Sequence, residues 1–94
     1  MSNDIKLVKL KSGEELIGDV TVVGDSVAIA NPCQIIPTQD GMGFAPWPPF
    51  SKNSNVTIKT DWTICITEPV DAARDAWNSK FGSGILLPNV QLNG

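Results

Sequence analysis

The sequence predicts a mainly β protein, with a small, strongly bent sheet of five strands followed by one C-terminal helix. Through residues 5–31, apolar and polar residues alternate on both sides of Ser12-Gly13 and of Gly24-Asp25. This pattern is typical of three consecutive strands joined by tight turns. After residue 68 the apolar spacing changes from two to about 3.6 residues, which indicates a helix.

A length of 94 residues allows one domain, residues 1–94, with one modest core. We expect strands within about 4–67, a helix over about 69–81 and an extended tail over 82–94. Seven Lys and Arg against ten Asp and Glu give a net charge of −3, so whole-molecule charge does not favour nucleic-acid binding. No apolar run approaches the length of about 20 residues that spans a bilayer, and no signal peptide is recognisable, so we expect a cytoplasmic protein without membrane contact.

The sequence contains no histidine and only two cysteines, Cys33 and Cys65. The commonest general base is therefore missing, as is any Ser-His or Cys-His pair. Two cysteines are too few for a tetrahedral zinc site. We expect a protein that is not an enzyme and holds no metal or other cofactor, with both cysteines as small core residues rather than a disulfide.

The first strand, about residues 4–11, has apolar residues on both faces. Ile5 and Leu7 share one face, whereas Val8 and Leu10 share the other. Either a bulge shifts the phase near Leu7-Val8, or both faces are covered, one by the core and one by a helix or a neighbour.

The second strand, about 14–23, contains Gly18, where we expect the sheet to bend. The third strand starts after Asp25-Ser26 and contains Pro32, which cannot donate to a strand partner. We therefore predict an edge position or a bulge at Pro32, with a bend in the strand.

Two segments resemble the motifs of the Sm and Sm-like (LSm) family. Residues 9–31 are similar to the first Sm motif, and residues 58–69, IKTDWTICITEP, are similar in shape to the second. The matching positions of the first motif are Lys9, Leu10, Lys11, Ser12, Gly13, Leu16, Gly18, Val20, Asp25, Val27, Ile29 and Asn31. The whole chain looks most like the compact Sm-like proteins of large tailed phages, so the resemblance implies an SH3-like or Sm-like barrel acting in the cytoplasm of the host cell.

The resemblance also implies a partner and a site. Its members form cyclic homo-oligomers of five to seven subunits, in which the fourth strand of one subunit pairs with the fifth strand of the next. The implied ligand is single-stranded RNA or DNA, with Lys59 contacting the backbone and Trp62 either stacking or supporting the loop. The other candidate binding residues are Thr60, Asp61, Asp25, Lys9 and Lys11. The lysines of the first strand fit equally a solvated strand face.

Residues 38–55 are rich in glycine and proline and predict either a short fourth strand or a long hairpin loop. Phe44, Trp47 and Phe50 either cap the open end of the barrel or form an exposed aromatic platform. The second arrangement supports an alternative function, a ring-forming protein-interaction module that does not bind nucleic acid. Asp61, which would repel phosphate, and the acidic balance favour that alternative.

The helix is expected to start with Pro69 at its first position and Asp71 in its first turn. Gly82 is the expected C-terminal cap. An apolar stripe along the helix, which consists of Val70, Ala73, Trp77 and Phe81, should pack across the sheet and cover the extra apolar face of the first strand.

Overall fold

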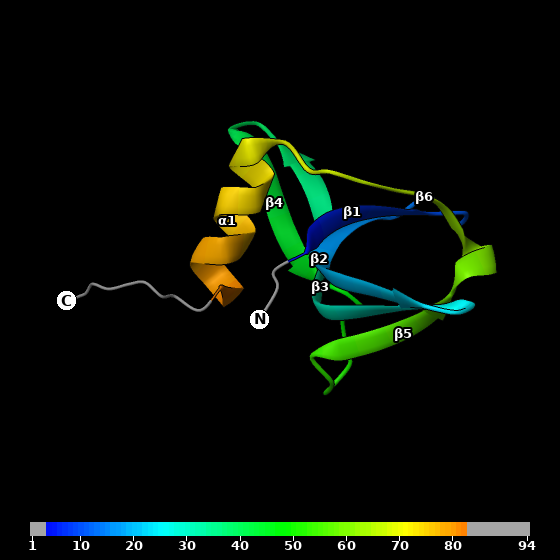
Figure 1. The fold of residues 1–94 in the computed structure, drawn as a ribbon. Helices are drawn as coiled ribbons and strands as arrows, with labels where there is room; N and C mark the ends of the chain where they lie inside the picture. Colours follow the sequence, from blue (N-terminus) through cyan, green and yellow to red (C-terminus); the bar gives the residue numbers. More distant parts are fainter. Residues whose placement is uncertain (1–3, 83–94) are drawn as a thin grey trace.

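The computed structural model describes residues 4–82, in which six strands, one 3-10 turn and one α-helix follow each other along the chain (Figure 1). The strands are β1 (Ile5–Leu10), β2 (Glu15–Val23), β3 (Ser26–Thr38), β4 (Gly41–Pro46), β5 (Asn55–Lys59) and β6 (Thr63–Thr67). The 3-10 turn η1 (Thr60–Trp62) separates β5 from β6, and α1 spans Asp71–Phe81. The prediction of a mainly β protein with one helix near its C-terminus is confirmed. The tail predicted beyond Gly82 lies outside the described residues.

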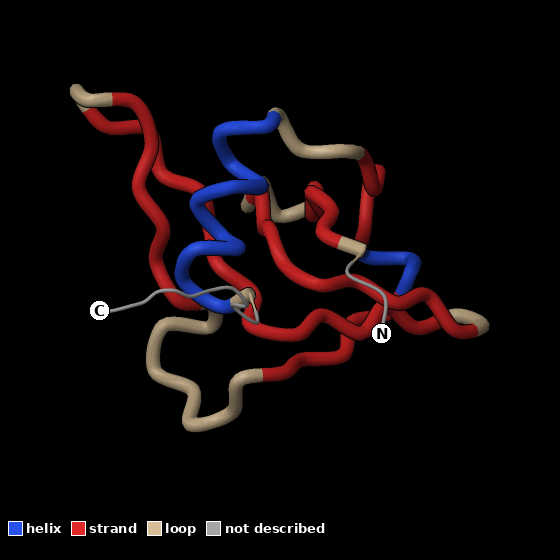
Figure 2. Tube along the Cα trace, turned by 60° about the vertical axis from the view of Figure 1, so that its left-hand side comes forward, coloured by secondary structure: helices blue, strands red, loops and turns tan. Residues whose placement is uncertain are grey.

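All strand pairs are antiparallel and form one open sheet in the order β4-β3-β2-β1-β6, with β5 also paired to β3. The long strand β3 is the centre of this arrangement. Along one edge it pairs with β2, while β5 pairs with its first half (Ser26–Ala30) and β4 with its second half (Cys33–Thr38). The β3–β4 hairpin extends away from the rest of the sheet (Figure 2).

The expected count of five strands was wrong for a specific reason. Because β4 and β5 both run antiparallel to β3, they follow one another along the same edge, as two halves of one interrupted strand. Pro46 pairs with Cys33 and Asn55 pairs with Ala30, so residues 47–54 leave the edge opposite Asn31-Pro32 and then return to it. We call residues 47–54 the excursion.

The sheet bends where Gly18 faces Asn31-Pro32. Ile17 pairs with Cys33 but Asp19 pairs with Ala30, so the register shifts and β3 bulges at this point. Asn31 adopts φ 51°, a left-handed conformation that asparagine tolerates better than most residues. A Cβ at position 18 would lie 2.5 Å from Ile29 Cγ2, which explains the glycine. The bends predicted at Gly18 and at Pro32 are therefore confirmed.

Two apolar clusters lie on opposite faces of the sheet. The first consists of the buried residues Val8, Leu10, Leu16, Val20, Val27 and Ile29. The second consists of the buried residues Ile5, Ile17, Cys33, Ala73 and Trp77, and it includes α1, which covers this face. Since β1 contributes to both clusters, the alternative in which both of its faces are covered is the correct one.

The ends of α1 differ from the prediction by a few residues. Val70 is the N-cap residue, with extended backbone at φ −64° and ψ 155°, so Pro69 precedes the helix instead of starting it. Val70 is 66% exposed and does not belong to the buried stripe. Asp71 lies in the first turn and Gly82 is the C-cap residue, as expected.

Polar contacts attach the helix to the sheet. The Trp77 Nε1–H donates a hydrogen bond of 3.1 Å to the carbonyl oxygen of Asn31 at the bend of β3. Near the start of the helix, Glu68 forms ion pairs with Arg74, at 2.6 Å, and with Lys6. The hydrogen bond from Lys6 is the largest cause that lowers the pKa of the Glu68 carboxyl below its ordinary value.

Both cysteines are free thiols. Cys33 is buried in the second cluster, as predicted for a core residue. Cys65 is exposed, so its predicted core position is wrong; it lies on β6, which among residues 4–82 pairs only with β1. Among residues 4–82, no helix has the length and apolar content needed to cross a membrane.

Candidate functional site

The predicted site residues around Trp62 come together because β2 curves back on itself. Figure 1 shows the β1–β2 turn, the β2–β3 turn and η1 on the same side of the molecule. The Thr60 N–H donates to the carbonyl oxygen of Asp25 at 2.9 Å, and the Thr60 hydroxyl donates to the same oxygen at 3.2 Å. At the other end of η1, the Lys11 N–H donates to the carbonyl oxygen of Trp62 at 2.9 Å. The 3-10 turn therefore connects the two turns of the sheet.

Trp62 lies at the surface with a fixed orientation. Its side chain is 48% exposed, and its Nε1–H donates a hydrogen bond of 3.3 Å to Ser12 Oγ in the β1–β2 turn. The Ser12 hydroxyl in turn donates to Glu14, and this hydrogen bond is the largest cause that lowers the pKa of the Glu14 carboxyl. Residues 60–62 form a 3-10 turn rather than a strand, so Trp62 does not continue the strand that follows it.

An open hollow of about 660 Å³ lies beside η1, and we call it the end hollow. It is lined by Asp25, Trp47, Thr57, Ile58, Lys59, Asp61 and Trp62. Lys59 Nζ lies 3.7 Å from Asp25 Oδ2, and the two side chains are 75% and 80% exposed. Such an exposed pair contributes only about 0–1 kcal/mol, so Lys59 can exchange Asp25 for another anion at little cost.

The structure thus gathers four of the seven predicted binding residues, Asp25, Lys59, Asp61 and Trp62, around one hollow. Thr60 supports the hollow through its two hydrogen bonds to Asp25. Lys9 and Lys11 do not line it; the Lys9 ammonium instead donates to the carbonyl oxygen of Gly13 at 3.3 Å. Trp47 lines the hollow, although sequence reasoning placed it in a separate loop.

The three aromatic residues predicted as an interaction platform are separated. Phe44 packs against the second cluster and Trp47 against the first, whereas Phe50 is 98% exposed. Phe44 and Trp47 are therefore partly buried on opposite faces of the sheet, and only Phe50 has the exposure expected of a platform.

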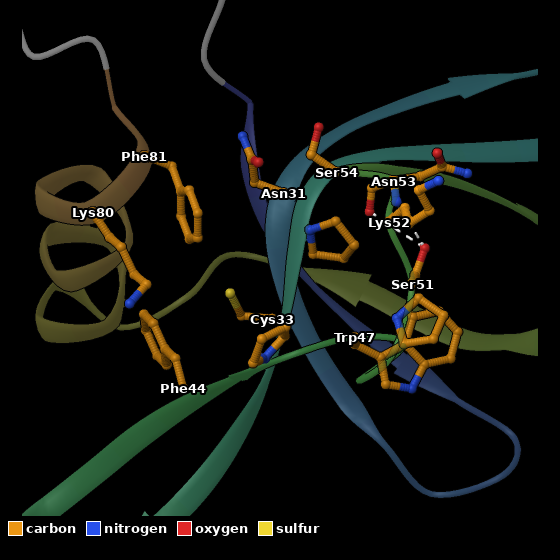
Figure 3. Close-up of a pocket in the computed structure, with 13 residues that line it drawn as sticks. Asn31, Cys33, Phe44, Trp47, Ser51, Lys52, Asn53, Ser54, Lys80 and Phe81 are labelled. Carbon is orange, nitrogen blue, oxygen red and sulfur yellow. Dashed lines mark hydrogen bonds between the residues drawn. The ribbon is translucent and has the colours of Figure 1, made fainter.

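A second pocket, of about 320 Å³, was not predicted from the sequence (Figure 3). It opens where the excursion leaves β3, and we call it the bend pocket. Its lining residues are Asn31, Pro32, Cys33, Phe44, Pro46, Trp47, Pro48, Ser51, Lys52, Asn53, Ser54, Lys80 and Phe81. The excursion is held by hydrogen bonds from the Trp47 N–H to the carbonyl oxygen of Pro32, at 3.1 Å, and from the Asn31 N–H to that of Ser54, at 2.6 Å.

The charge of the bend pocket differs from that of the end hollow. Its lining residues within the described part of the chain include two lysines, Lys52 and Lys80, and no aspartate or glutamate. Burial raises the pKa of the Cys33 thiol at the pocket, while the positive charge of Lys80 acts in the opposite direction. The sequence offered no signal for this site, because it depends on which residues the bend of β3 brings together.

Residues 4–82 contain no group of three or more Cys, Asp or Glu side chains arranged to hold a metal ion. A scan against protein-family models finds no model that matches the chain. A search of the curated proteins also finds no match. The resemblance to the Sm family therefore stays a prediction, and a functional argument depends on the geometry of the two pockets.

Proposed function

We propose that this chain is a non-enzymatic Sm-like protein that binds single-stranded nucleic acid, RNA before DNA, at the end hollow. The observation that carries the proposal is Trp62, a half-exposed indole oriented by Ser12 and bordering a hollow that Lys59 and Trp47 also line. Aromatic faces that stack on bases, next to cations that contact the backbone, are the chemistry by which proteins bind single strands. The absence of histidine from the sequence supports a role without catalysis.

The charges of the hollow favour one orientation of the bound strand. Lys59 provides the positive charge for a phosphate, and its exposed pairing with Asp25 is readily exchanged. Asp61 disfavours a phosphate on its own side of the hollow, because like charges repel. A bound strand would therefore place its backbone near Lys59 and a base against Trp62.

The strand path supports the finer architecture that the family implies. We propose that β6-β1-β2-β3-β5 is an SH3-like or Sm-like barrel, in which η1 connects the two edge strands. Within residues 4–82, the outer edges of β5 and β6 have no strand partner. Pairing of β5 in one copy with β6 in the next would satisfy both edges in a closed ring of five to seven copies, working in the cytoplasm of the host cell if the gene belongs to a phage.

The test is fluorescence anisotropy of a labelled single-stranded RNA across a salt series, after light scattering has established the oligomeric state. We expect a ring whose affinity falls with salt, by about 0.7 log units per tenfold salt for each phosphate contact. Lys59→Ala should weaken binding about fivefold, which corresponds to about 1 kcal/mol, and Asp61→Asn should strengthen it. A stable monomer, or equal effects of the two substitutions, would contradict the proposal.

One observation favours a second candidate function, a ring-forming protein-interaction module. Phe50 is 98% exposed, so its ring is available for contact with a protein partner. In this case the ring would bind no RNA at low salt, and it would bind a protein partner with little salt dependence. Phe50→Ser would then remove that binding, whereas Lys59→Ala would leave it unchanged.

A further inference from the structure

The bend pocket has the features of a binding site for a flat ring that carries a negative charge. Figure 3 shows Phe81, Lys80 and Phe44 on one side, Trp47 and Ser51 on the other, and Cys33 between them. Aromatic walls bind a flat ring by stacking, and the volume of about 320 Å³ is at the lower end of the range for small-molecule sites.

The positive charge of the pocket favours a ligand in which the flat ring carries a negatively charged group. The protein as a whole has a net charge of −3, yet the described lining residues include two lysines and no carboxylate. Lys80 Nζ lies 5.9 Å from the centroid of the Phe81 ring, so its ammonium stays beside an aromatic wall. The positive charge therefore borders the same space as the aromatic rings. This combination is complementary to a nucleotide, which carries a phosphate close to a flat base.

The two pockets are neighbours. Trp47 lines both the end hollow and the bend pocket, and its backbone is fixed by the hydrogen bond to Pro32. A single strand held at Trp62 and Lys59 can thus continue past Trp47 without leaving the surface. Both pockets combine aromatic residues with lysines, the composition that sequence-tolerant binding of single strands uses.

We propose that the bend pocket binds one nucleotide unit of the same strand, with its base among Phe44, Trp47 and Phe81 and its phosphate at Lys52 and Lys80. This inference rests on the proposed function and extends it, since it assigns a second contact point on the opposite side of Trp47. The excursion, which interrupts the β4–β5 edge, then serves to form this point.

The first test compares variants of the full-length protein in anisotropy titrations with a labelled 12-nucleotide oligouridylate. The double variant Lys52→Gln/Lys80→Gln should lose about tenfold in affinity, and its salt slope should fall by about 0.7, because the contact with one phosphate is removed. Lys6→Gln is the control: it removes a lysine that lines neither pocket and should leave affinity and slope close to those of the unmodified protein. Circular dichroism verifies that each variant is folded.

The outcomes separate this inference from the proposed function. If Lys59→Gln weakens binding but the double variant behaves like Lys6→Gln, the bend pocket does not bind the strand and the inference is overturned, while the proposed function stands. If the unmodified protein binds no oligonucleotide at low salt, both are overturned.

A second measurement tests the ligand chemistry without the oligonucleotide. Titration of the ¹⁵N-labelled protein with uridine monophosphate should shift the amide signals of the non-proline residues within 31–33, 44–54 and 80–81. Uridine and inorganic phosphate, each at the same concentration, should cause smaller shifts there. Equal shifts with inorganic phosphate alone would overturn the recognition of a nucleotide, because the pocket would then be a site for any anion.

Discussion

The sheet leaves no room for a side chain at Gly18, which gives a sharp prediction for Gly18→Ala. A Cβ at this position would lie 2.5 Å from Ile29 Cγ2 and 2.9 Å from the carbonyl oxygen of Ala30. Ile29 is 1% exposed and belongs to the first cluster, and the second atom is backbone, so neither can move without disturbing the bend.

The magnitude follows from two opposing effects. Overpacking of this kind destabilises the fold by about 1–3 kcal/mol. Replacing glycine also reduces the conformational entropy of the unfolded chain, which stabilises the fold by about 0.4–1 kcal/mol. We therefore expect a net loss of about 1–2 kcal/mol in the free energy of unfolding. For a domain of this size, that loss lowers the melting temperature by about 4–16 °C.

The assay is thermal unfolding followed by circular dichroism, with Gly43→Ala as the matched control. Gly43 also lies in a strand, but the nearest atoms to its added Cβ are Thr38 Cγ2 at 3.3 Å and the carbonyl oxygen of Ile36 at 3.9 Å. Gly43→Ala should change the melting temperature by only a few degrees, about what 0.4–1 kcal/mol produces. Equal melting temperatures of the two variants would refute the steric argument.

Two further substitutions test how the helix is attached. Trp77→Phe should lower the free energy of unfolding in urea by about 1–3 kcal/mol, because the carbonyl of Asn31 loses its donor; Trp62→Phe, at an exposed position, should change it by less than about 0.5 kcal/mol. Similar values for both would contradict the role of the Trp77 hydrogen bond. Glu68→Gln should reduce the dependence of the melting temperature on pH. The hydrogen bond from Lys6 lowers the pKa of Glu68, so its contribution is complete above the ordinary value of 4.5 and is lost as the pH falls through the lower value of the folded protein. Parallel melting curves for the unmodified protein and the variant between about pH 7 and pH 3 would exclude this contribution.

The fold was predictable where a residue type has only one structural use. Pro32 cannot donate in a sheet, and a glycine within a strand pattern marks a bend. The sequence pattern alone therefore predicts the bend on both strands, at Gly18 and at Pro32. The apolar residues on both faces of β1 left two explanations, a bulge or two covered faces, and the structure shows two covered faces. By contrast, the split of β4 and β5 was not predictable, because only the register opposite Asn31-Pro32 reveals that both strands share one edge.

The candidate site was predictable only in part, for a similar reason. The segment from Lys59 to Trp62 and the turn at Asp25 were identified, and hydrogen bonds join them in the structure. Trp47 was assigned to a separate loop because its neighbours are prolines, whereas tertiary packing directs it to the end hollow. The bend pocket combines side chains from β3, β4, the excursion and α1, and no local pattern brings such distant residues together.

The interrupted edge of β3 also bears on how freely this protein can change during evolution. Hydrogen-bonded strands hold the chain on both sides of the excursion, at Pro46 with Cys33 and at Asn55 with Ala30. The register of the sheet is therefore independent of the length and sequence of residues 48–54, as long as Trp47 keeps its place against the core. New specificities can arise in this segment by insertion or replacement while the scaffold stays unchanged, and the same segment is the natural place for a designed graft.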